Sequence, residues 1–252
     1  MKLPISVAIV CKDEEDRIEP CLASCGFADE IVVVDSGSQD RTLEIARRYT
    51  DRIHAREWTG WRDQKQWAAA QCRNDWVFTL DADEVVSDAL RDEIAAEFAA
   101  GPKASGYDMP RQTWYQGRWI RHSGWYPDRK LRLYKRSAAK FGGDDPHEVI
   151  EVPEPVGHLH GDLIHHTYRD LRHQALQLVR YAWVNAEARR ARGKRFHFTD
   201  LLFRPPWACF KSYVLQQGFR DGMPGFIIGV MVGYYTFLKY ARLWEMGGQG
   251  KR

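Results

Sequence analysis

The sequence lacks an excess of charge of either sign. Its 37 Lys and Arg residues are matched by 34 Asp and Glu residues, which leaves a formal net charge of +3 over 252 residues. A protein built around nucleic-acid phosphates needs a large basic excess, so we expect no nucleic-acid partner. Repeats and low-complexity segments are also missing. The length and the balanced composition predict a globular protein with a substantial core.

Cysteine is scarce and shows no pairing pattern. The five cysteines are an odd number without a C-x-x-C pair, which argues against a disulfide framework or a zinc site. The first residues, MKLPISVAIVC, hold too short an apolar run for a signal peptide. We therefore expect a cytoplasmic protein whose cysteines are reduced and pack as small hydrophobic residues. They are Cys11, Cys21, Cys25, Cys72 and Cys209.

No apolar run is long enough for an ordinary transmembrane helix. The longest, residues 223–238, is interrupted by one proline and three glycines, whereas a spanning helix needs about 20 apolar residues. Residues 169–252 are instead rich in Arg, Lys, Trp, Tyr and Phe. This composition predicts a helical, basic and aromatic C-terminal region that associates with an anionic membrane surface.

Short apolar runs alternate with helix-like stretches in the first hundred residues. Residues 5–11, 31–34 and 76–80 are β-branched and apolar, and each is followed by a polar turn and a helical pattern. This alternation predicts an α/β fold with a mostly parallel, doubly wound sheet and helices on both faces. Residues 101–168 look strand-rich and complete a first domain, 1–168. Among them, KLRLYKR predicts a strand with one buried face.

Carboxylates follow three of the predicted strands. They are Asp13 with Glu14, then Asp35, and finally Asp81 with Asp83. Ligands of such sheets bind at the carboxyl ends of the strands, so we expect these acids to converge on one crevice. Each also has a structural alternative. Asp13 and Glu14 could lie in a solvated loop, Asp35 could form an Asx turn, and the third group could cap a helix.

The third group, in LDADE, contains a D-x-D pattern. Carboxylates at Asp81 and Asp83 suit a hard divalent cation, which would hold a diphosphate and stabilise its charge as it leaves. Asp35 suits a base or ribose, because the Ser36–Gly37 turn lets the backbone approach a ligand closely. We expect Glu84 to serve the start of the following helix.

The ordered set VAIVCKDEEDRI, IVVVDSGSQDRT and WVFTLDADE resembles the nucleotide-sugar half of family-two glycosyltransferases with the GT-A fold. Further along, RKLRLYKR, DDPHEVIEV, HHTYRDL and the tail resemble small glucosyltransferases of lipopolysaccharide inner-core assembly, and this likeness covers nearly the whole chain. One common family pattern, a Glu-Asp pair that serves as the catalytic base, is not found in that form. The resemblance implies a donor half, 1–100, and an acceptor half, 101–168, in the first domain.

The resemblance implies an inverting, Mg²⁺- or Mn²⁺-dependent transfer of glucose from UDP-glucose to the lipopolysaccharide inner core at the inner face of the cytoplasmic membrane. The base that takes the acceptor proton has three candidates in GGDDPHEV, Asp144, Asp145 and Glu148. The resemblance favours Glu148, and the alternative is that Glu148 forms a structural pair with His147. Asp81 and Asp83 would hold the metal. Apart from the resemblance, His165 or His166 could supply a further metal or phosphate ligand. We expect Arg129, Lys130 and Arg132 to contact phosphate, the alternative being solvated surface charge. The expected donor-binding residues are Lys12, Asp13, Glu14, Asp35, Ser36, Gly37, Lys65, Asp81, Ala82 and Asp83.

Other functions fit parts of the sequence. The sugar could be galactose, an N-acetylhexosamine or a heptose, and the acceptor another lipid-linked or cell-envelope glycan. A haloacid-dehalogenase-type phosphotransferase also ends a strand in D-x-D, but it has a small hydroxyl residue where this chain has Val85. A membrane- or carbohydrate-binding module would suit the ten tryptophans and leave the acidic strand ends unexplained. We therefore expect an enzyme, a glycosyltransferase.

Overall fold

A computed structural model describes residues 2–144 and 147–248. Its contacts divide the chain into two units. The first is an α/β unit of residues 2–112, Asp128–Gly143 and His147–His166. The second contains Thr113–Pro127 and the chain from Thr167 onward. The segment Thr113–Pro127 is one that we expected in the first domain, 1–168. The predicted domain boundaries stay a prediction.

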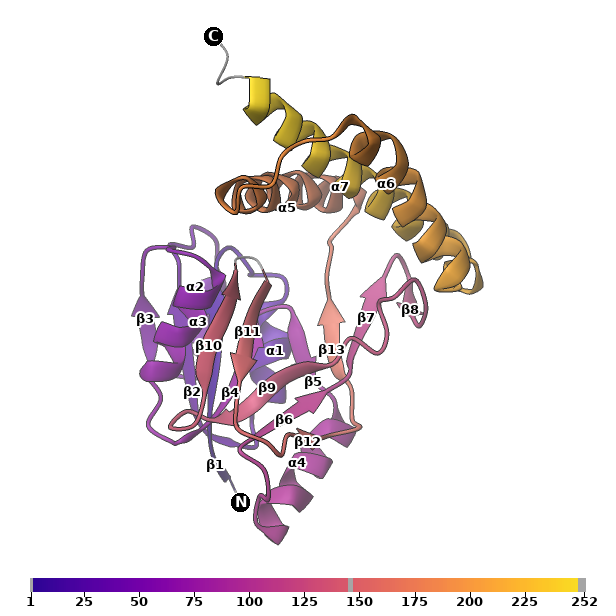
Figure 1. Ribbon diagram of the computed structural model, residues 1–252. Helices are drawn as coiled ribbons and strands as arrows, with labels where there is room; N and C mark the ends of the chain where they lie inside the picture. Colours follow the sequence, from indigo (N-terminus) through magenta and orange to yellow (C-terminus); the bar gives the residue numbers. More distant parts are fainter. Residues whose placement is uncertain (1, 145–146, 249–252) are drawn as a thin grey trace. The chain divides into compact units, whose positions relative to one another are not determined.

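The α/β unit is built on a seven-stranded sheet with the order β12-β6-β9-β4-β1-β2-β3 (Figure 1). In this order β1, β2, β3 and β4 run parallel, and β9 is antiparallel to both of its neighbours. The sheet is therefore mostly parallel, as the sequence predicts. The strands are β1 (Leu3–Cys11), β2 (Ala28–Asp35), β3 (Ile53–Ala55), β4 (Trp76–Asp81), β6 (Gly106–Met109), β9 (Lys130–Lys135) and β12 (Gly157–His158).

Helices cover both faces of this sheet. Alternate residues of β1 point to opposite faces, so that Val7 and Ile9 pack with α1, α2 and α4, whereas Ala8 packs with α3. The hairpin of β10 (Lys140–Asp144) and β11 (His147–Glu151) adds Ile150 to the second cluster. The predicted two-sided cover is confirmed. The helices are α1 (Ile18–Ser24), α2 (Thr42–Ala46), α3 (Trp61–Ala70) and α4 (Asp88–Ala100).

The strand predicted from KLRLYKR is β9, but the prediction of a single buried face is wrong. Three consecutive residues, Arg132, Leu133 and Tyr134, are all buried. The reason is that β9 lies inside the sheet, between β4 and β6, where both faces are covered. One consequence is that a guanidinium group, that of Arg132, enters the interior of the α/β unit.

The second unit is mainly helical. In it α7 packs against both α5 and α6 (Figure 1). A Cβ atom at Gly229 would lie 3.1 Å from Cβ of Tyr213, and one at Gly233 would lie 3.2 Å from the carbonyl oxygen of Pro205. The glycines that interrupt the apolar run therefore allow close helix packing. The elements are β7 (Arg111–Tyr115), β8 (Arg118–Ile120), α5 (Leu171–Ala191), α6 (Phe198–Phe210), the π-helix η1 (Lys211–Leu215), the 3₁₀-helix η2 (Gly218–Asp221) and α7 (Gly222–Gly248).

Within residues 2–144 and 147–248, no helix combines the length and the apolarity that crossing a membrane requires.

Candidate active site

The acidic strand ends meet at one edge of the sheet. The register of β1 with β2 places Asp35 beside Cys11, and the register of β1 with β4 places Asp81 beside Val10. The loop after β1 is tied to the loop after β2, since the amide of Asp13 donates a hydrogen bond of 2.9 Å to Oγ of Ser38. The expected convergence of these acids is confirmed.

The carboxylate of Asp35 holds the loop that follows it. It accepts hydrogen bonds of 3.0 Å from the backbone N–H groups of Gly37 and Ser38, and Gly37 has a φ of +90°, which favours glycine. These contacts form the Asx turn that was the structural alternative for this residue, so binding of a base or ribose stays a prediction. A hollow of about 400 Å³ is lined by Asp35, Leu43, Arg47, Asp51, Ile53 and Ala55.

The first aspartate of the D-x-D pattern lies between two cations of the chain itself. Oδ1 of Asp81 is 2.7 Å from Nζ of Lys65, and Oδ2 is 2.7 Å from Nη2 of Arg132. Burial alone would raise the pKa of Asp81, but the charges of Lys65 and Arg132 outweigh it and hold this pKa well below its usual range. The crowding of acids at this strand end is thus relieved without a ligand.

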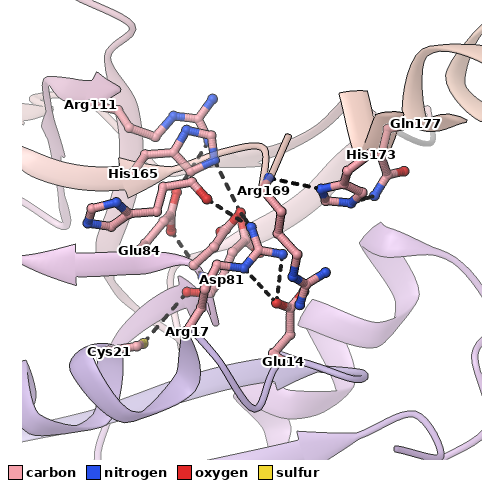
Figure 2. A network of polar contacts seen from close by, with 12 residues as sticks. Glu14, Arg17, Cys21, Asp81, Glu84, Arg111, His165, Arg169, His173 and Gln177 are labelled. Carbon is pink, nitrogen blue, oxygen red and sulfur yellow. Dashed lines mark hydrogen bonds and ion pairs between the residues drawn. The ribbon is translucent and has the colours of Figure 1, made fainter. Parts of the chain in front are cut away.

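Glu84 is fully buried at the start of β5 (Glu84–Val86), so the prediction that it serves the start of a helix is wrong. Its Oε1 lies 2.8 Å from Arg132. The same oxygen lies 3.3 Å from Arg111, and Oε2 accepts the amide of Asp81 at 3.0 Å (Figure 2). Ser87 caps α4 instead, by accepting a backbone N–H of the helix. Three hydrogen-bonding groups therefore offset the cost of burying the Glu84 carboxylate.

The second aspartate of the pattern has different partners. Oδ2 of Asp83 lies 3.4 Å from Nε2 of His165, in β13 (Leu163–His166), and 3.6 Å from Nη1 of Arg17. Burial would raise the pKa of Asp83, and the charge and hydrogen bond of His165 are the largest effects that lower it, with a net lowering. Arg17 also pairs with Glu14 at 2.8 Å (Figure 2). The predicted metal ligands Asp83 and His165 thus come together, the first from the turn between β4 and β5 and the second from β13.

These donors fit a Mg²⁺ or Mn²⁺ ion whose other ligands come from substrate. Such ions are commonly held by one or two carboxylates, with phosphate oxygens and waters completing the shell. Asp83 and His165 bring one oxygen and one nitrogen to within 3.4 Å of each other, whereas Asp81 contacts Lys65 and Arg132. Among the residues described, no group of three or more His, Cys, Asp or Glu side chains is arranged to hold a metal. The three-ligand set stays a prediction.

The candidate base contacts the same lysine as Asp81. Oε1 of Glu148, in β11, lies 2.6 Å from Nζ of Lys65. Lys65 is 3% exposed, so its ammonium group is almost entirely surrounded by protein and needs both carboxylates. The alternative base, Asp145, lies outside the described residues. The role of Glu148 as a base stays a prediction, but its position beside the D-x-D pattern is a finding.

The other predicted contacts differ in their surroundings. Ser36 is buried and its Oγ accepts a hydrogen bond of 3.0 Å from Gln64, Ala82 is buried, and Lys12 is exposed. Two predicted phosphate contacts pair with acids away from the D-x-D pattern, Arg129 with Asp108 and Lys130 with Asp128.

Sequence reasoning missed Arg17 and Arg111. The first contacts Asp83 and the second contacts Glu84. A signal was available, because buried carboxylates need cations and Arg17 follows the acidic run KDEED directly. Nothing in the local pattern around Arg111 singles it out.

The acids lie at the carboxyl edge of a mostly parallel sheet, which is where α/β proteins of this kind bind their ligands. The family model for glycosyl transferase family 2 matches residues 6–149. A lipopolysaccharide core biosynthesis glycosyltransferase, LpsC of Rhizobium meliloti (strain 1021), is 32% identical over 97% of this chain and 93% of its own length. An uncharacterized glycosyltransferase of Rickettsia typhi is 28% identical over 96% of this chain and 87% of its own.

The solved structures that match are more distant in sequence. S. aureus TarS 1-349 has a TM-score of 0.48 at 15% identity, covering 99% of this chain and 92% of that one. Glucosyl-3-phosphoglycerate synthase of Mycobacterium tuberculosis, in complex with phosphoglyceric acid, has a TM-score of 0.49 at 16% identity, covering 73% and 78%.

The chain belongs to glycosyl transferase family 2. It is a glycosyltransferase with a GT-A-like α/β fold, as the sequence motifs predict. Members of this family pass a sugar from a nucleotide-sugar donor to a glycan acceptor.

Proposed function

We propose that this glycosyltransferase moves glucose from UDP-glucose to the inner core of lipopolysaccharide, with inversion at the sugar carbon and with Mg²⁺ or Mn²⁺. The observation that carries the proposal is the shared lysine, because Lys65 lies 2.7 Å from Asp81 and 2.6 Å from Glu148. The candidate base thus lies beside the acids that would hold the cation of the donor diphosphate. The acceptor is supported by the relative named for lipopolysaccharide core biosynthesis.

In the proposed reaction a hydroxyl group of the acceptor attacks C1 of the donor sugar. The bond between C1 and the phosphate oxygen breaks, and UDP leaves with that electron pair. Glu148 takes the hydroxyl proton as the new glycosidic bond forms. Lys65 holds the Glu148 carboxylate in position for this transfer. A general base of this kind contributes about 10²–10⁴-fold to the rate.

A bound Mg²⁺ or Mn²⁺ would neutralise the charge that develops on the leaving diphosphate. Asp83 and His165 would hold it, together with Asp81 as the third predicted ligand. Arg132 and Lys65 add positive charge beside Asp81, and such preorganised charge stabilises a transition state. Metal and protein cations would thus act on the same group of the donor.

The hollow beside Asp35 is the proposed place of the uracil. It has apolar walls from Leu43 and Ile53 and one buried carboxylate, a combination typical of small-molecule sites. The loop residues Asp13, Glu14, Ser36 and Gly37 belong to the same edge of the sheet, and we assign the ribose and phosphates to them.

The second unit is the proposed membrane-binding part. No residue of α6 is buried, and the exposed fractions of Phe198, Phe203 and Trp207 are 69%, 64% and 57%. The preceding loop exposes Lys194 and Arg195. Aromatic side chains that insert and basic side chains that meet anionic headgroups act together at a membrane surface. We therefore place the enzyme peripherally at the inner face of the cytoplasmic membrane, where a lipid-anchored acceptor would lie.

The test is a transfer assay with purified full-length protein, a panel of UDP-sugars and a lipopolysaccharide core acceptor that lacks the added sugar. We expect glucose transfer that needs Mn²⁺ or Mg²⁺, stops in EDTA and is abolished by Asp83→Asn without loss of thermal stability. The control is Asp92→Asn, since Asp92 is 71% exposed on α4. Full wild-type activity in EDTA would remove the metal from the proposal.

The same assay separates the other parts of the proposal. Transfer from a different UDP-sugar would replace glucose, and transfer only to another lipid-linked glycan would replace the acceptor. A ligand that binds the folded state raises its unfolding temperature, so a thermal-shift screen of the same UDP-sugars with Mn²⁺ identifies the donor independently. If no UDP-sugar shifts the transition and none is turned over, the proposed donor is wrong.

A further inference from the structure

Three cations from three different helices surround one buried aromatic ring in the second unit. The guanidinium carbon of Arg189, on α5, lies 5.5 Å from the ring centroid of Tyr240. That of Arg204, on α6, also lies 5.5 Å away, and Nζ of Lys239, on α7, lies 5.4 Å away. Tyr240 is 3% exposed. The packing of α5, α6 and α7 therefore brings three positive charges around one ring.

Carboxylates do not balance this charge. Arg204 pairs with Asp200 one turn earlier on α6. In residues 2–144 and 147–248, neither Arg189 nor Lys239 forms an ion pair with a carboxylate. Burial, followed by the charges of the two arginines, lowers the pKa of Lys239 to about 8. An ammonium group that loses water near two guanidinium groups is unfavourable unless an anion joins them.

The aromatic rings around Lys239 compensate only in part. Its Nζ lies 5.0 Å from the ring centroid of Tyr235 and 5.4 Å from that of Tyr240, which are cation–π distances. An aromatic ring attracts a cation more weakly than an anion does. The rings also leave the repulsion among the three cations in place. The ring of Tyr240 thus organises the cluster, and the missing component is negative charge.

We propose that Arg189, Arg204 and Lys239 form a binding site for a phosphate group. Two guanidinium groups and one ammonium group are the donors that phosphate oxygens prefer, the first through paired N–H groups and the second as a compact charge. Exposed Phe203 precedes Arg204, and exposed Phe237 lies two residues before Lys239. Apolar side chains beside a phosphate site suit a phosphate ester carried by a lipid headgroup, an assignment of source that rests on the proposed membrane association.

The test compares vesicles of equal surface charge that differ in the anionic group. Phosphatidylcholine vesicles carry either phosphatidic acid or oleate, and binding of full-length protein is measured by co-sedimentation. We expect Lys239→Met and Arg189→Gln each to weaken binding to phosphatidic acid vesicles by about tenfold or more, the size of hydrogen bonds to charged groups. On oleate vesicles both variants should lose only about fivefold, the general effect of one basic residue near the surface.

The matched controls are Lys194→Met and Arg195→Gln in the exposed loop between α5 and α6. Each removes one positive charge outside the cluster, and we expect the same loss of about fivefold or less on both kinds of vesicle. Lys239→Arg keeps the charge and should retain most of the phosphate preference. Unfolding curves of all variants check that each is folded.

A second measurement identifies the source of the phosphate. If the site also accepts free phosphate, inorganic phosphate raises the unfolding temperature of the wild type above that in chloride of equal ionic strength, and it does not do so for Lys239→Met. If only phosphatidic acid vesicles separate the variants, the site is specific for a lipid headgroup. Either result supports a phosphate site.

Equal losses for cluster and loop variants on both vesicles, with no stabilisation by free phosphate, would overturn the proposal. These measurements need no donor sugar. A failure of the proposed glucose transfer therefore leaves the phosphate site testable, and a failure of the phosphate site leaves the transfer assay unaffected.

Discussion

The ammonium group of Lys65 lies 2.6 Å from the carboxylate of Glu148, although 83 residues separate them in the chain. Lys65 belongs to α3 and Glu148 to β11, and the exposed fractions of their side chains are 3% and 14%. The same ammonium contacts Asp81 at 2.7 Å. A single buried cation thus joins the D-x-D strand to the strand of the candidate base.

This contact predicts energetic coupling between the two residues. In a double-mutant cycle of Lys65→Met and Glu148→Gln, we expect the unfolding free energies to be non-additive by about 1–3 kcal/mol. The control cycle pairs Lys65→Met with Glu151→Gln, because Glu151 is exposed on the same strand, and it should be additive within about 0.5 kcal/mol. Urea unfolding measures all five variants, and an additive first cycle would refute the buried contact.

Glu148→Gln also tests the proposed chemistry. The amide keeps the shape of the side chain but cannot take a proton, so we expect kcat to fall by about 10²–10⁴-fold. Binding of the UDP-sugar, measured by calorimetry, should stay within a few-fold of the wild type. Glu151→Gln should leave kcat unchanged. An unaltered kcat for Glu148→Gln would exclude it as the base and direct attention to Asp145.

Local patterns in the sequence predict the sheet and the edge where the site lies. The alternating and apolar runs of β1, β2 and β4 are short-range signals, and parallel strands bring their carboxyl ends together whatever the details of packing. The order of the strands and acids along the chain is therefore sufficient to place Asp35 and Asp81 near each other. The family motifs then indicate the class of enzyme.

The pairing of charges could not be predicted in this way. Glu84 looks like a helix-start residue because acids are common there, yet Arg111 and Arg132 approach it from strands β7 and β9. Such contacts depend on which distant strands become neighbours. The burial of Arg132 likewise follows from the interior position of β9, which the alternation in KLRLYKR does not reveal.

The buried position of Glu84 predicts a large effect on stability. Glu84→Gln leaves Arg132 and Arg111 without their shared carboxylate, and breaking a buried pair in this way costs about 3–5 kcal/mol. The control is Glu57→Gln at an exposed position, which we expect to stay within about 0.5 kcal/mol of the wild type. Chemical denaturation measures both, and similar stabilities for the two variants would contradict the structural role of Glu84.

The cation cluster around Tyr240 predicts an unusual dependence of stability on pH. The pKa of Lys239 is lowered to about 8 from an ordinary value of 10.5, through burial first and then the charges of Arg189 and Arg204. Between these two values the unfolded chain binds more protons at this residue than the folded chain does. The penalty of the charged lysine is therefore fully present below about pH 8 and disappears as the pH rises toward the unfolded value.

We expect the unfolding free energy of the wild type to rise relative to that of Lys239→Met by about 1–2 kcal/mol between pH 7.5 and 10. This is less than the full shift in the pKa of Lys239 implies, because solvent screens a partly buried group. Taking the difference removes most of the contribution of other groups near the cluster, Asp200, Tyr235 and Tyr240 among them. For Lys194→Met the difference from the wild type should stay flat over this range, since this lysine is exposed. A flat difference for Lys239→Met would mean that its ammonium group is as well solvated in the folded protein as in the unfolded chain, and that the three cations do not repel one another appreciably.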